Sequence, residues 1–354
     1  MNESTRSPGL DEELRFLRSP SAYGAGVDRV RALQTHMSWL FFAGDCVYKL
    51  KKPVRHDFLD FSTPARREFY CREELRLNAR LAPGVYLGLL ALQWHGGRFT
   101  LLPAGAQGRV GDTVDWLVRM RRLDAKDMLD RRIRDGRVAL ADVDALLQRL
   151  VSFYRGQPAA LVDPAAYHAG FLRQQAGNRA VLLGPKGGLP GSAAALDRLD
   201  AALLGLGPLL RERARASQVL EGHGDLRPEH VCLEHPPVVI DCLEFNAALR
   251  RVDPFDEIAY LALECEMAGA AWIGARLWQG CAAALPQPPP PALRWLYTAY
   301  RALLRARLVL AHLLDPAPRT PSRWAPLALR YIGRAQQALD ALDALSTAPG
   351  TGPS

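Results

Sequence analysis

The chain has 354 residues, of which 49% are hydrophobic and 23% are charged, a composition typical of soluble globular proteins. A chain of this length is long enough for two compact lobes or domains. The formal net charge is +8, which suits an anionic ligand such as a nucleotide phosphate. No basic run with interleaved aromatic residues indicates a nucleic-acid interface, so we expect no nucleic-acid partner.

The N-terminal residues contain no apolar segment of the kind that a signal peptide requires. No uninterrupted apolar run is long enough to span a bilayer. The six cysteines are scattered without a C-x-x-C pair, which is typical of buried thiols in a reducing compartment. The sequence therefore predicts a cytoplasmic protein with no membrane partner, and it leaves the oligomeric state open.

The first third of the chain predicts a small β-rich region. A hairpin that turns at Gly44 precedes a helix that opens at Pro64, where Ser62 or Thr63 is the expected N-cap. In chain order, the predicted elements are a helix near 10–18, the hairpin over 36–54, the helix over 64–82 and strands at about 85–93, 98–103 and 113–120.

From about residue 122 the pattern becomes mostly helical, and a hairpin over residues 218–241 interrupts it. Helices are predicted at 125–134, 139–155, 164–180, 193–216, 254–268, 272–284, 291–314 and 324–345. The sequence therefore predicts a β-rich lobe over residues 1–121, a helical lobe over 122–345 and a disordered tail over 346–354.

Two carboxylates frame that second hairpin. In EGHGDLRPEHVCLEHPPVVIDCLEFN, residues 221–246, Asp225 follows one apolar run and Asp241 follows the next. If both runs are strands of one hairpin, the two aspartates lie roughly 5–10 Å apart on neighbouring strands. Carboxylates that close repel each other unless a cation or a shared proton intervenes. Mg²⁺ prefers one or two carboxylates plus phosphate oxygens, and the other carboxylate could then orient a hydroxyl and accept its proton.

Lysine is rare in this chain, and its distribution is informative. Five of the 45 basic residues are lysines, and three of these lie in VYKLKK, residues 47–52. The lysine ammonium is a compact point charge that suits a phosphate, and arginine is not interchangeable with it. On a strand, Val47, Lys49 and Lys51 share one face. The pattern indicates a phosphate-binding lysine on this strand.

These segments resemble, in order, the motifs of the kinase-like fold in its aminoglycoside-phosphotransferase form. HGDLRPEHV is similar to the catalytic loop H-G-D-x-x-x-x-N, IDCLEF to the strand end that binds metal, and DPFDEIAYLA to the helix start that follows. VYKL is similar to the lysine strand and CREELRLNARLAP to the αC helix. The resemblance implies an α+β, bilobal protein-kinase-like fold with a small β-rich N-terminal lobe and a large, mainly helical C-terminal lobe.

By position, the resemblance implies that Asp225 orients the acceptor hydroxyl and that Asp241 binds Mg²⁺ at the β- and γ-phosphates of ATP. Lys49 matches the phosphate-binding lysine, and Val47 would contact the adenine. Glu74 is predicted to pair with Lys49, with the adjacent Glu73 as the alternative.

The remaining positions depart from the pattern in places. Residues 120–123 resemble the hinge, so the backbone of Met120 and Arg121 would hold the adenine. His230 stands where the family has asparagine as a second metal ligand, and imidazole is a poor ligand for a hard cation. Either one Mg²⁺ suffices or Glu244 supplies the missing oxygen; the alternative is impaired catalysis. The hairpin expected to cover the nucleotide contains Gly44 alone, without a glycine-rich loop.

The short segment after Asp241 leaves no room for a long activation loop, so a small-molecule hydroxyl acceptor is favoured. Charged residues of the later helices are expected to be structural or solvent-exposed: Asp253 as an N-cap; Asp256, Glu257, Glu264 and Glu266 on a solvated face; Arg294, Arg301 and Arg305 on the surface. The sequence predicts an ATP- and Mg²⁺-dependent small-molecule kinase. The alternatives are a catalytically impaired nucleotide-binding regulator of the same fold and, from the charge alone, a nucleic-acid-binding protein.

Overall fold

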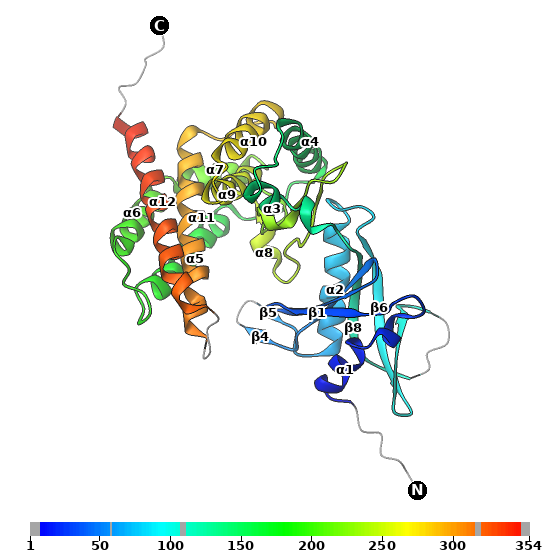
Figure 1. Cartoon of the computed structure of the whole chain (residues 1–354). Helices are drawn as coiled ribbons and strands as arrows, with labels where there is room; N and C mark the ends of the chain where they lie inside the picture. The colour runs from blue at the N-terminus through cyan, green and yellow to red at the C-terminus, as the bar shows by residue number, and fades with distance from the viewer. Residues whose placement is uncertain (1–7, 57–58, 107–110, 316–319, 348–354) are drawn as a thin grey trace. The chain divides into compact units, whose positions relative to one another are not determined.

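The structure is a computed structural model, and it describes residues 8–56, 59–106, 111–315 and 320–347 (Figure 1). It divides into two compact units. The first unit comprises Met1–Arg131 and His230–Leu249, and the second comprises Arg132–Glu229 and Arg250–Ser354. From residue 348 onward, the predicted disordered tail lies outside the described residues. Among the described helices, none combines the length and the apolar character that crossing a membrane requires.

The first unit is built on a six-stranded antiparallel sheet with the strand order β1-β2-β3-β8-β6-β7. Its strands are β1 (Val30–Gln34), β2 (Ser38–Ala43), β3 (Cys46–Lys51), β6 (Tyr86–His95), β7 (Arg98–Pro103) and β8 (Asp112–Arg121). Smaller pieces of this unit are β4 (Arg55–His56), β5 (Leu59–Asp60), β10 (Val231–Cys232) and β11 (Val238–Val239).

Strand β1 was not predicted. Four of its five residues are exposed, so it has no alternation of buried and exposed side chains to mark it in the sequence. Its backbone nevertheless pairs with β2 along its whole length, from Val30 opposite Ala43 to Gln34 opposite Trp39. Backbone pairing with β2, and not burial of its side chains, therefore holds β1 at the edge of the sheet.

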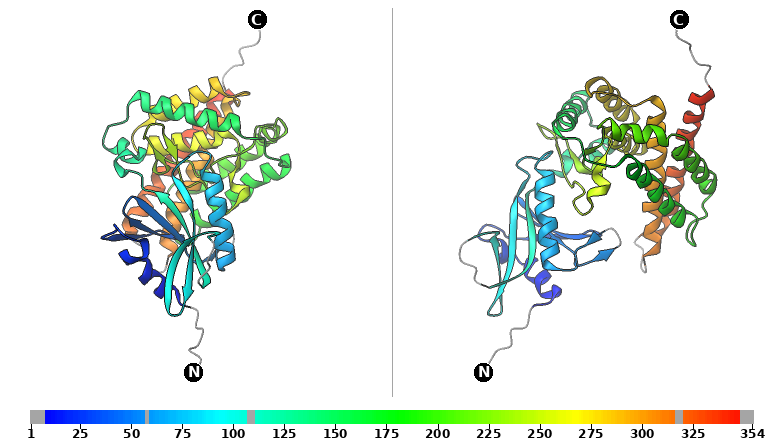
Figure 2. Two further views of the ribbon diagram at one scale, coloured as in Figure 1. Left: turned by 90° about the vertical axis from the view of Figure 1, so that its right-hand side faces the viewer. Right: turned by 180° about the vertical axis from the view of Figure 1, so that it is seen from behind.

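One helix packs on each face of this sheet. Helix α1 (Leu10–Leu17) contributes Leu14 and Leu17 to the core cluster on one face. Helix α2 (Pro64–Asn78) packs against β8 and β6 on the other face, where Cys71 joins the second core cluster (Figure 2). Thr63 caps α2 by accepting the backbone N–H of Arg66, as predicted.

The second unit is mainly helical, and α11 and α12 lie side by side in it (Figures 1 and 2). Its elements are α4 (Leu140–Gly156), α5 (Pro164–Leu182), α6 (Ser192–Gly205), α7 (Gly207–Arg215), β9 (Leu220–Glu221), β12 (Arg251–Val252), α9 (Pro254–Met267), α10 (Ala271–Ala284), α11 (Pro291–Ala311) and α12 (Pro321–Thr347). At the unit boundaries lie α3 (Leu129–Arg134) and α8 (Ala247–Arg250), together with 3₁₀ turns at Ala125–Asp127 and Pro228–His230. The single helix predicted over 193–216 is two helices, because Gly205, Gly207 and Pro208 interrupt it.

The prediction that Asp225 and Asp241 follow neighbouring strands of one hairpin is wrong. The strand before Asp225, β9, pairs with β12, which comes about thirty residues later in the chain. The hairpin around Pro236-Pro237 is made of β10 and β11 alone. Asp225 therefore lies in the loop that follows β9, while Asp241 lies two residues beyond the end of β11.

Candidate functional site

Lys49 is the centre of an ion-pair network in the first unit. Its Nζ donates to Glu74 Oε1 at 2.8 Å and to Asp241 Oδ1 at 2.7 Å. Strand β3 directs Lys49 to the face of the sheet that α2 covers, and α2 carries Glu74. Burial alone would lower the pKa of Lys49, but the negative charges of Asp241 and Glu74 raise it well above its ordinary value. Lys49 is therefore a fixed cation between two carboxylates.

The two glutamates that were candidate partners of Lys49 lie on different sides of α2. Glu74 is completely buried. Burial alone would raise its pKa, but the charges of Lys49 and Lys51 lower it overall. Glu73 instead pairs with Arg76, at 2.9 Å, on the exposed side of the helix. The structure thus pairs Lys49 with Glu74.

Lys51 extends this network, although no pattern in the sequence indicated a partner for it. Its Nζ donates to Glu74 Oε2 at 2.6 Å and to Glu244 Oε1. The Lys51 side chain is 1% exposed. Burial disfavours the ammonium, but the charges of Glu244 and Glu74 raise the pKa of Lys51 overall. The two oxygens of Glu74 are therefore divided between two lysines that share one face of β3.

The backbone around Asp241 is held by side chains from α2 and β6. Asp241 adopts a left-handed conformation with φ 59°, and its N–H donates to the hydroxyl of Tyr86 at 3.0 Å. The next N–H, of Cys242, donates to Asn78 Oδ1 at 2.9 Å, and Asn78 Nδ2 donates to the backbone oxygen of Glu74 at 2.8 Å. Asn78 lies one helical turn after Glu74, which is the sequence signal that could have identified it.

The three predicted metal ligands do not form one cluster. His230 Nε2 lies 3.6 Å from Asp241 Oδ2, whereas Glu244 is occupied by Lys51. Throughout the described ranges, no three His, Cys, Asp or Glu side chains are grouped as a metal site requires. Burial opposes ionisation of Asp241, but Lys49 and His230 lower its pKa overall. With 46% of its side chain exposed, Asp241 fits Mg²⁺ held by one carboxylate and phosphate oxygens, without Glu244.

A row of side chains crosses the same face of the sheet beside Lys49. Val47 lies opposite Phe42 on β2 and opposite Met120 on β8, and Met120 lies opposite Tyr86 on β6. Directly opposed residues of antiparallel strands point to the same face. Val47 and Met120, two of the predicted adenine contacts, therefore lie side by side on the face that carries Lys49.

The predicted contribution of Arg121 is limited by its backbone bonds. Its N–H donates to Val85 O at 2.8 Å, and its guanidinium binds Glu234. The following N–H, of Arg122, donates to Asp45 O at 2.8 Å. In this hinge segment, the N–H groups of Arg121 and Arg122 are therefore both engaged by the protein and not available to a base.

Gly44 does not lie where a phosphate-covering turn is needed. Its turn connects Ala43 to Cys46, and Cys46 lies opposite Arg121, so Gly44 is at the hinge end of the sheet. The turn over residues 35–37 is at the lysine end, because Ser38 lies opposite Lys51. That turn contains no glycine. The expectation that Gly44 covers the nucleotide phosphates is therefore wrong, because strand register puts it at the opposite end.

In the second unit, the loop after β9 is held by buried hydrogen bonds. Gly224 has φ 87°, a conformation that glycine adopts without strain. Its N–H donates to Glu257 Oε1, and Glu257 Oε2 accepts the hydroxyl of Tyr154 at 2.9 Å. The N–H of Asp225 donates to Nδ1 of His223 at 3.2 Å, and His223 is completely buried. The loop therefore fixes the backbone of Asp225.

The carboxylate of Asp225 is oriented from two sides. The hydroxyl of Tyr260 donates to Oδ1 at 3.3 Å, and Arg227 donates to Oδ2 at 3.0 Å. Burial raises the pKa of Tyr260, and the charge of Asp225 raises it further. Helix α9 supplies both Glu257 and Tyr260, which are three residues apart on one side of the helix. These contacts hold the carboxylate of Asp225 in a fixed direction. A group that positions a hydroxyl must be held in this way.

The expectation that the acidic residues of α9 form a solvated face is wrong for Asp256, Glu257 and Glu264, which are buried. Asp256 is 2% exposed and binds Arg301 at 2.6–2.7 Å, and Arg301 is itself buried. Glu264 binds Arg305 at 3.0 Å. Asp253 caps α9, as predicted, and also binds Arg213 at 2.6 Å. Asp253, Asp256 and Glu264 can be buried because each meets a guanidinium from another helix, whereas Glu257 accepts hydrogen bonds from Gly224 and Tyr154.

The fold is the kinase-like fold. The chain superposes on a choline kinase from Cryptosporidium parvum with a TM-score of 0.58 and 9% identity, over 96% of this chain and 98% of that one. A choline/ethanolamine kinase family protein from Mesorhizobium loti gives 0.54 and 15% identity, over 94% and 96%. An aminoglycoside phosphotransferase mutant in complex with AMP-PNP and hygromycin B gives 0.50 and 12%, over 98% and 100%. The predicted α+β, bilobal kinase-like fold is confirmed.

By sequence, the chain is similar to uncharacterized proteins of Mycobacterium tuberculosis and Mycobacterium bovis, each 30% identical to it over 330 residues. The match covers 91% of this chain and 63% of each relative, so the chain spans less than two thirds of their length. No protein-family model matches the chain.

Proposed function

We propose that the chain is a phosphotransferase that moves the γ-phosphoryl group of ATP to a hydroxyl of a small molecule. The observation that carries this proposal is the placement of Lys49 between Glu74 and Asp241, at 2.8 Å and 2.7 Å, in a chain with a kinase-like fold. The solved structures of this fold include choline kinases and an aminoglycoside phosphotransferase bound to AMP-PNP. A lysine braced by a helix carboxylate is how such a fold holds nucleotide phosphates.

The first unit would bind the nucleotide. The apolar surface under the adenine would be formed by Val47, Phe42 and Met120. Of these, Val47 lies on β3, two residues before Lys49. The Lys49 ammonium would bind phosphate oxygens, and Glu74 would keep it in place. Asp241 would hold Mg²⁺, which supplies charge neutralisation at the phosphates when it is bound.

The second unit would supply the group that prepares the acceptor. In the proposed reaction the acceptor oxygen forms a bond to the γ-phosphorus, and the bond from that phosphorus to the β,γ-bridging oxygen breaks. The proton of the hydroxyl passes to the carboxylate of Asp225. Tyr260 and Arg227 would act as positioning residues, since each holds one oxygen of that carboxylate.

The test is substitution of Asp225 by asparagine in the full chain. We expect Asp225→Asn to fold normally and to bind ATP with Mg²⁺ as the unchanged protein does, while turnover with a panel of hydroxylated metabolites falls by at least about 100-fold. Asp135→Asn is the matched control, because Asp135 forms an exposed ion pair with Arg137 and its loss should leave turnover unchanged.

The outcomes separate this proposal from its alternative. Full turnover in the Asp225→Asn protein would remove the proposed role of Asp225. Tight ATP binding without turnover of any acceptor in the unchanged protein would instead support a nucleotide-binding regulator, for which His230 in place of asparagine is the motivation. A coupled ADP-release assay and isothermal titration calorimetry with ATP provide the two measurements.

A further inference from the structure

Two lysines of β3 attach the segment that follows β11 to the sheet. Lys49 and Lys51 lie on the same face of the strand, about 7 Å apart along it. Glu74 accepts from Lys49 through Oε1 at 2.8 Å and from Lys51 through Oε2 at 2.6 Å. Each lysine also binds a second carboxylate, Asp241 for Lys49 and Glu244 for Lys51. The segment is therefore held along β3 at two points, three residues apart.

The two attachments differ in their access to a ligand. Lys49 and Asp241 are 14% and 46% exposed, whereas Lys51 and Glu244 are 1% and 8% exposed. In the proposed function, Lys49 binds phosphate oxygens and Asp241 holds the metal ion, so the direct contact between these two side chains would be given up. The buried contact between Lys51 and Glu244 would remain, because a nucleotide does not reach it.

The backbone of Asp241 requires such an anchor. Its φ of 59° lies in the left-handed region, which residues with a side chain rarely adopt. A conformation of this kind persists only where the surrounding structure determines it. The N–H of Asp241 is held by Tyr86 and that of Cys242 by Asn78. Glu244 adds an attachment at the other end of the segment, through its side chain.

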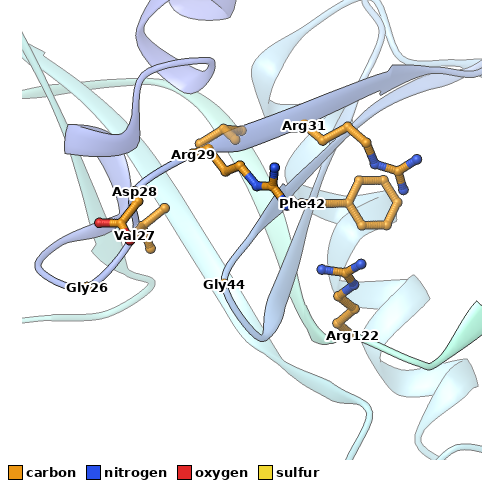
Figure 3. A pocket seen from close by; sticks show the side chains of 9 residues that line it. Gly26, Val27, Asp28, Arg29, Arg31, Phe42, Gly44 and Arg122 are labelled. Carbon is orange, nitrogen blue, oxygen red and sulfur yellow. The ribbon is translucent and has the colours of Figure 1, made fainter.

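Lys51 is remote from the part of the site that would hold the base. In the proposed function, the base lies in a pocket of about 680 Å³ at the hinge end of the sheet, whose lining includes Phe42, Gly44 and Arg122 (Figure 3). Lys51 lies opposite Ser38, at the other end of β3. Loss of Lys51 would therefore act on the carboxylate that holds the metal ion and not on the surface that holds the base.

We propose that Lys51 is a positioning residue for the metal-binding carboxylate. By holding Glu244 next to Glu74 of α2, it keeps Asp241 in the place where it meets the Mg²⁺ ion of a bound nucleotide. This role rests on the proposed phosphoryl transfer and adds a second lysine to it. Residues that orient a metal ligand typically change metal affinity roughly 10- to 100-fold when they are lost. The expected defect is specific, because nucleotide binding without metal does not depend on Asp241.

The test is calorimetric titration of the full chain with ATP, once with Mg²⁺ and once with EDTA. We expect Lys51→Met to weaken binding by about ten-fold or more with Mg²⁺ and by less than about three-fold with EDTA. Glu244→Ala removes the same contact but leaves Lys51 paired with Glu74, so it should fold more readily and show the same selective defect. Lys51→Arg keeps a cation between the two glutamates and should restore part of the affinity with Mg²⁺.

Arg67→Met is the matched control for loss of stability. Arg67 lies two helical turns before Glu74 on α2, and it forms another buried ion pair, with Asp115 at 2.7 Å. Its replacement should destabilise the protein for the same reason as Lys51→Met does. ATP binding by the folded Arg67→Met protein should be unchanged, both with Mg²⁺ and with EDTA.

The outcomes separate this role from the proposed function. A defect confined to Mg²⁺ in Lys51→Met and Glu244→Ala, and absent from Arg67→Met, supports the role of Lys51. Equal weakening with Mg²⁺ and with EDTA, unchanged binding in both variants, or the same defect in Arg67→Met would overturn that role and leave the proposed phosphoryl transfer in place. No ATP binding by the unchanged protein under either condition would refute the nucleotide site itself, and the role of Lys51 with it.

Discussion

Replacing Lys51 by methionine tests the buried part of the ion-pair network most directly. Lys51 connects Glu74 to Glu244, and the three side chains are 1%, 0% and 8% exposed. Methionine keeps the unbranched apolar stem but removes the ammonium, so Glu244 and one oxygen of Glu74 lose their cation. Water cannot readily replace it, because all three side chains are buried.

The expected cost follows from that burial. Removing one partner of a buried ion pair costs roughly 3–5 kcal/mol, because the other charge remains without compensation. The double variant Lys51→Met with Glu244→Gln also removes the orphaned charge. Its free energy of unfolding should exceed the value expected from adding the two single effects by about 1–3 kcal/mol, the usual coupling of residues in direct contact.

Urea unfolding of the full chain, followed by tryptophan fluorescence, measures these differences. Lys52→Met is the matched control, because the neighbouring Lys52 reaches an exposed backbone oxygen at Thr35 and should change the free energy of unfolding by less than about 1 kcal/mol. A Lys51→Met protein as stable as Lys52→Met would refute the reasoning, and so would strict additivity in the double variant.

Three further predictions concern other buried groups. Burial raises the pKa of Glu13 to about 8. Between the ordinary pKa of 4.5 and 8, the folded protein therefore binds more protons than the unfolded chain, so the free energy of unfolding should fall as the pH rises through that range. Glu13→Gln should flatten this pH dependence in thermal melts. Arg301→Met leaves the buried charge of Asp256 without its cation, and urea unfolding should show a loss of roughly 3–5 kcal/mol that Asp256→Asn in the same chain partly restores. Tyr260→Phe removes one hydrogen bond to Asp225, so kcat should fall roughly 2- to 10-fold with the KM for ATP unchanged, whereas an equal change in both would contradict a positioning role.

The chain's local patterns were sufficient to predict its kinase-like fold. Alternation along β3 put Val47 and Lys49 on one face, and the cap at Thr63 with Pro64 defined the start of α2. These signals depend on residues within a few positions of one another, which is why they can be read from the sequence. The order of the short motifs along the chain then indicated the fold, although each motif alone is a weak signal.

The arrangement of the site required contacts between distant segments. No local pattern indicates that β9 pairs with β12, and the shorter loop to the next apolar run made the wrong hairpin the simpler prediction. Lys51 and Glu244 are 193 positions apart in the sequence, so neither residue reveals the other as its partner. The acids of α9 were predicted to be solvated because a charge is costly to bury alone.

The sequence by itself determined which residues carry charge, which strand faces hold them and where the helices begin. The tertiary structure alone decided which charges meet, because a buried carboxylate is stabilised where another segment brings a cation or a hydrogen-bond donor to it. The orientation of Lys49 was therefore predictable from its strand. The sharing of Glu74 between two lysines, and the pairing of Asp256 on α9 with Arg301 on α11, are set by packing between segments far apart in the chain.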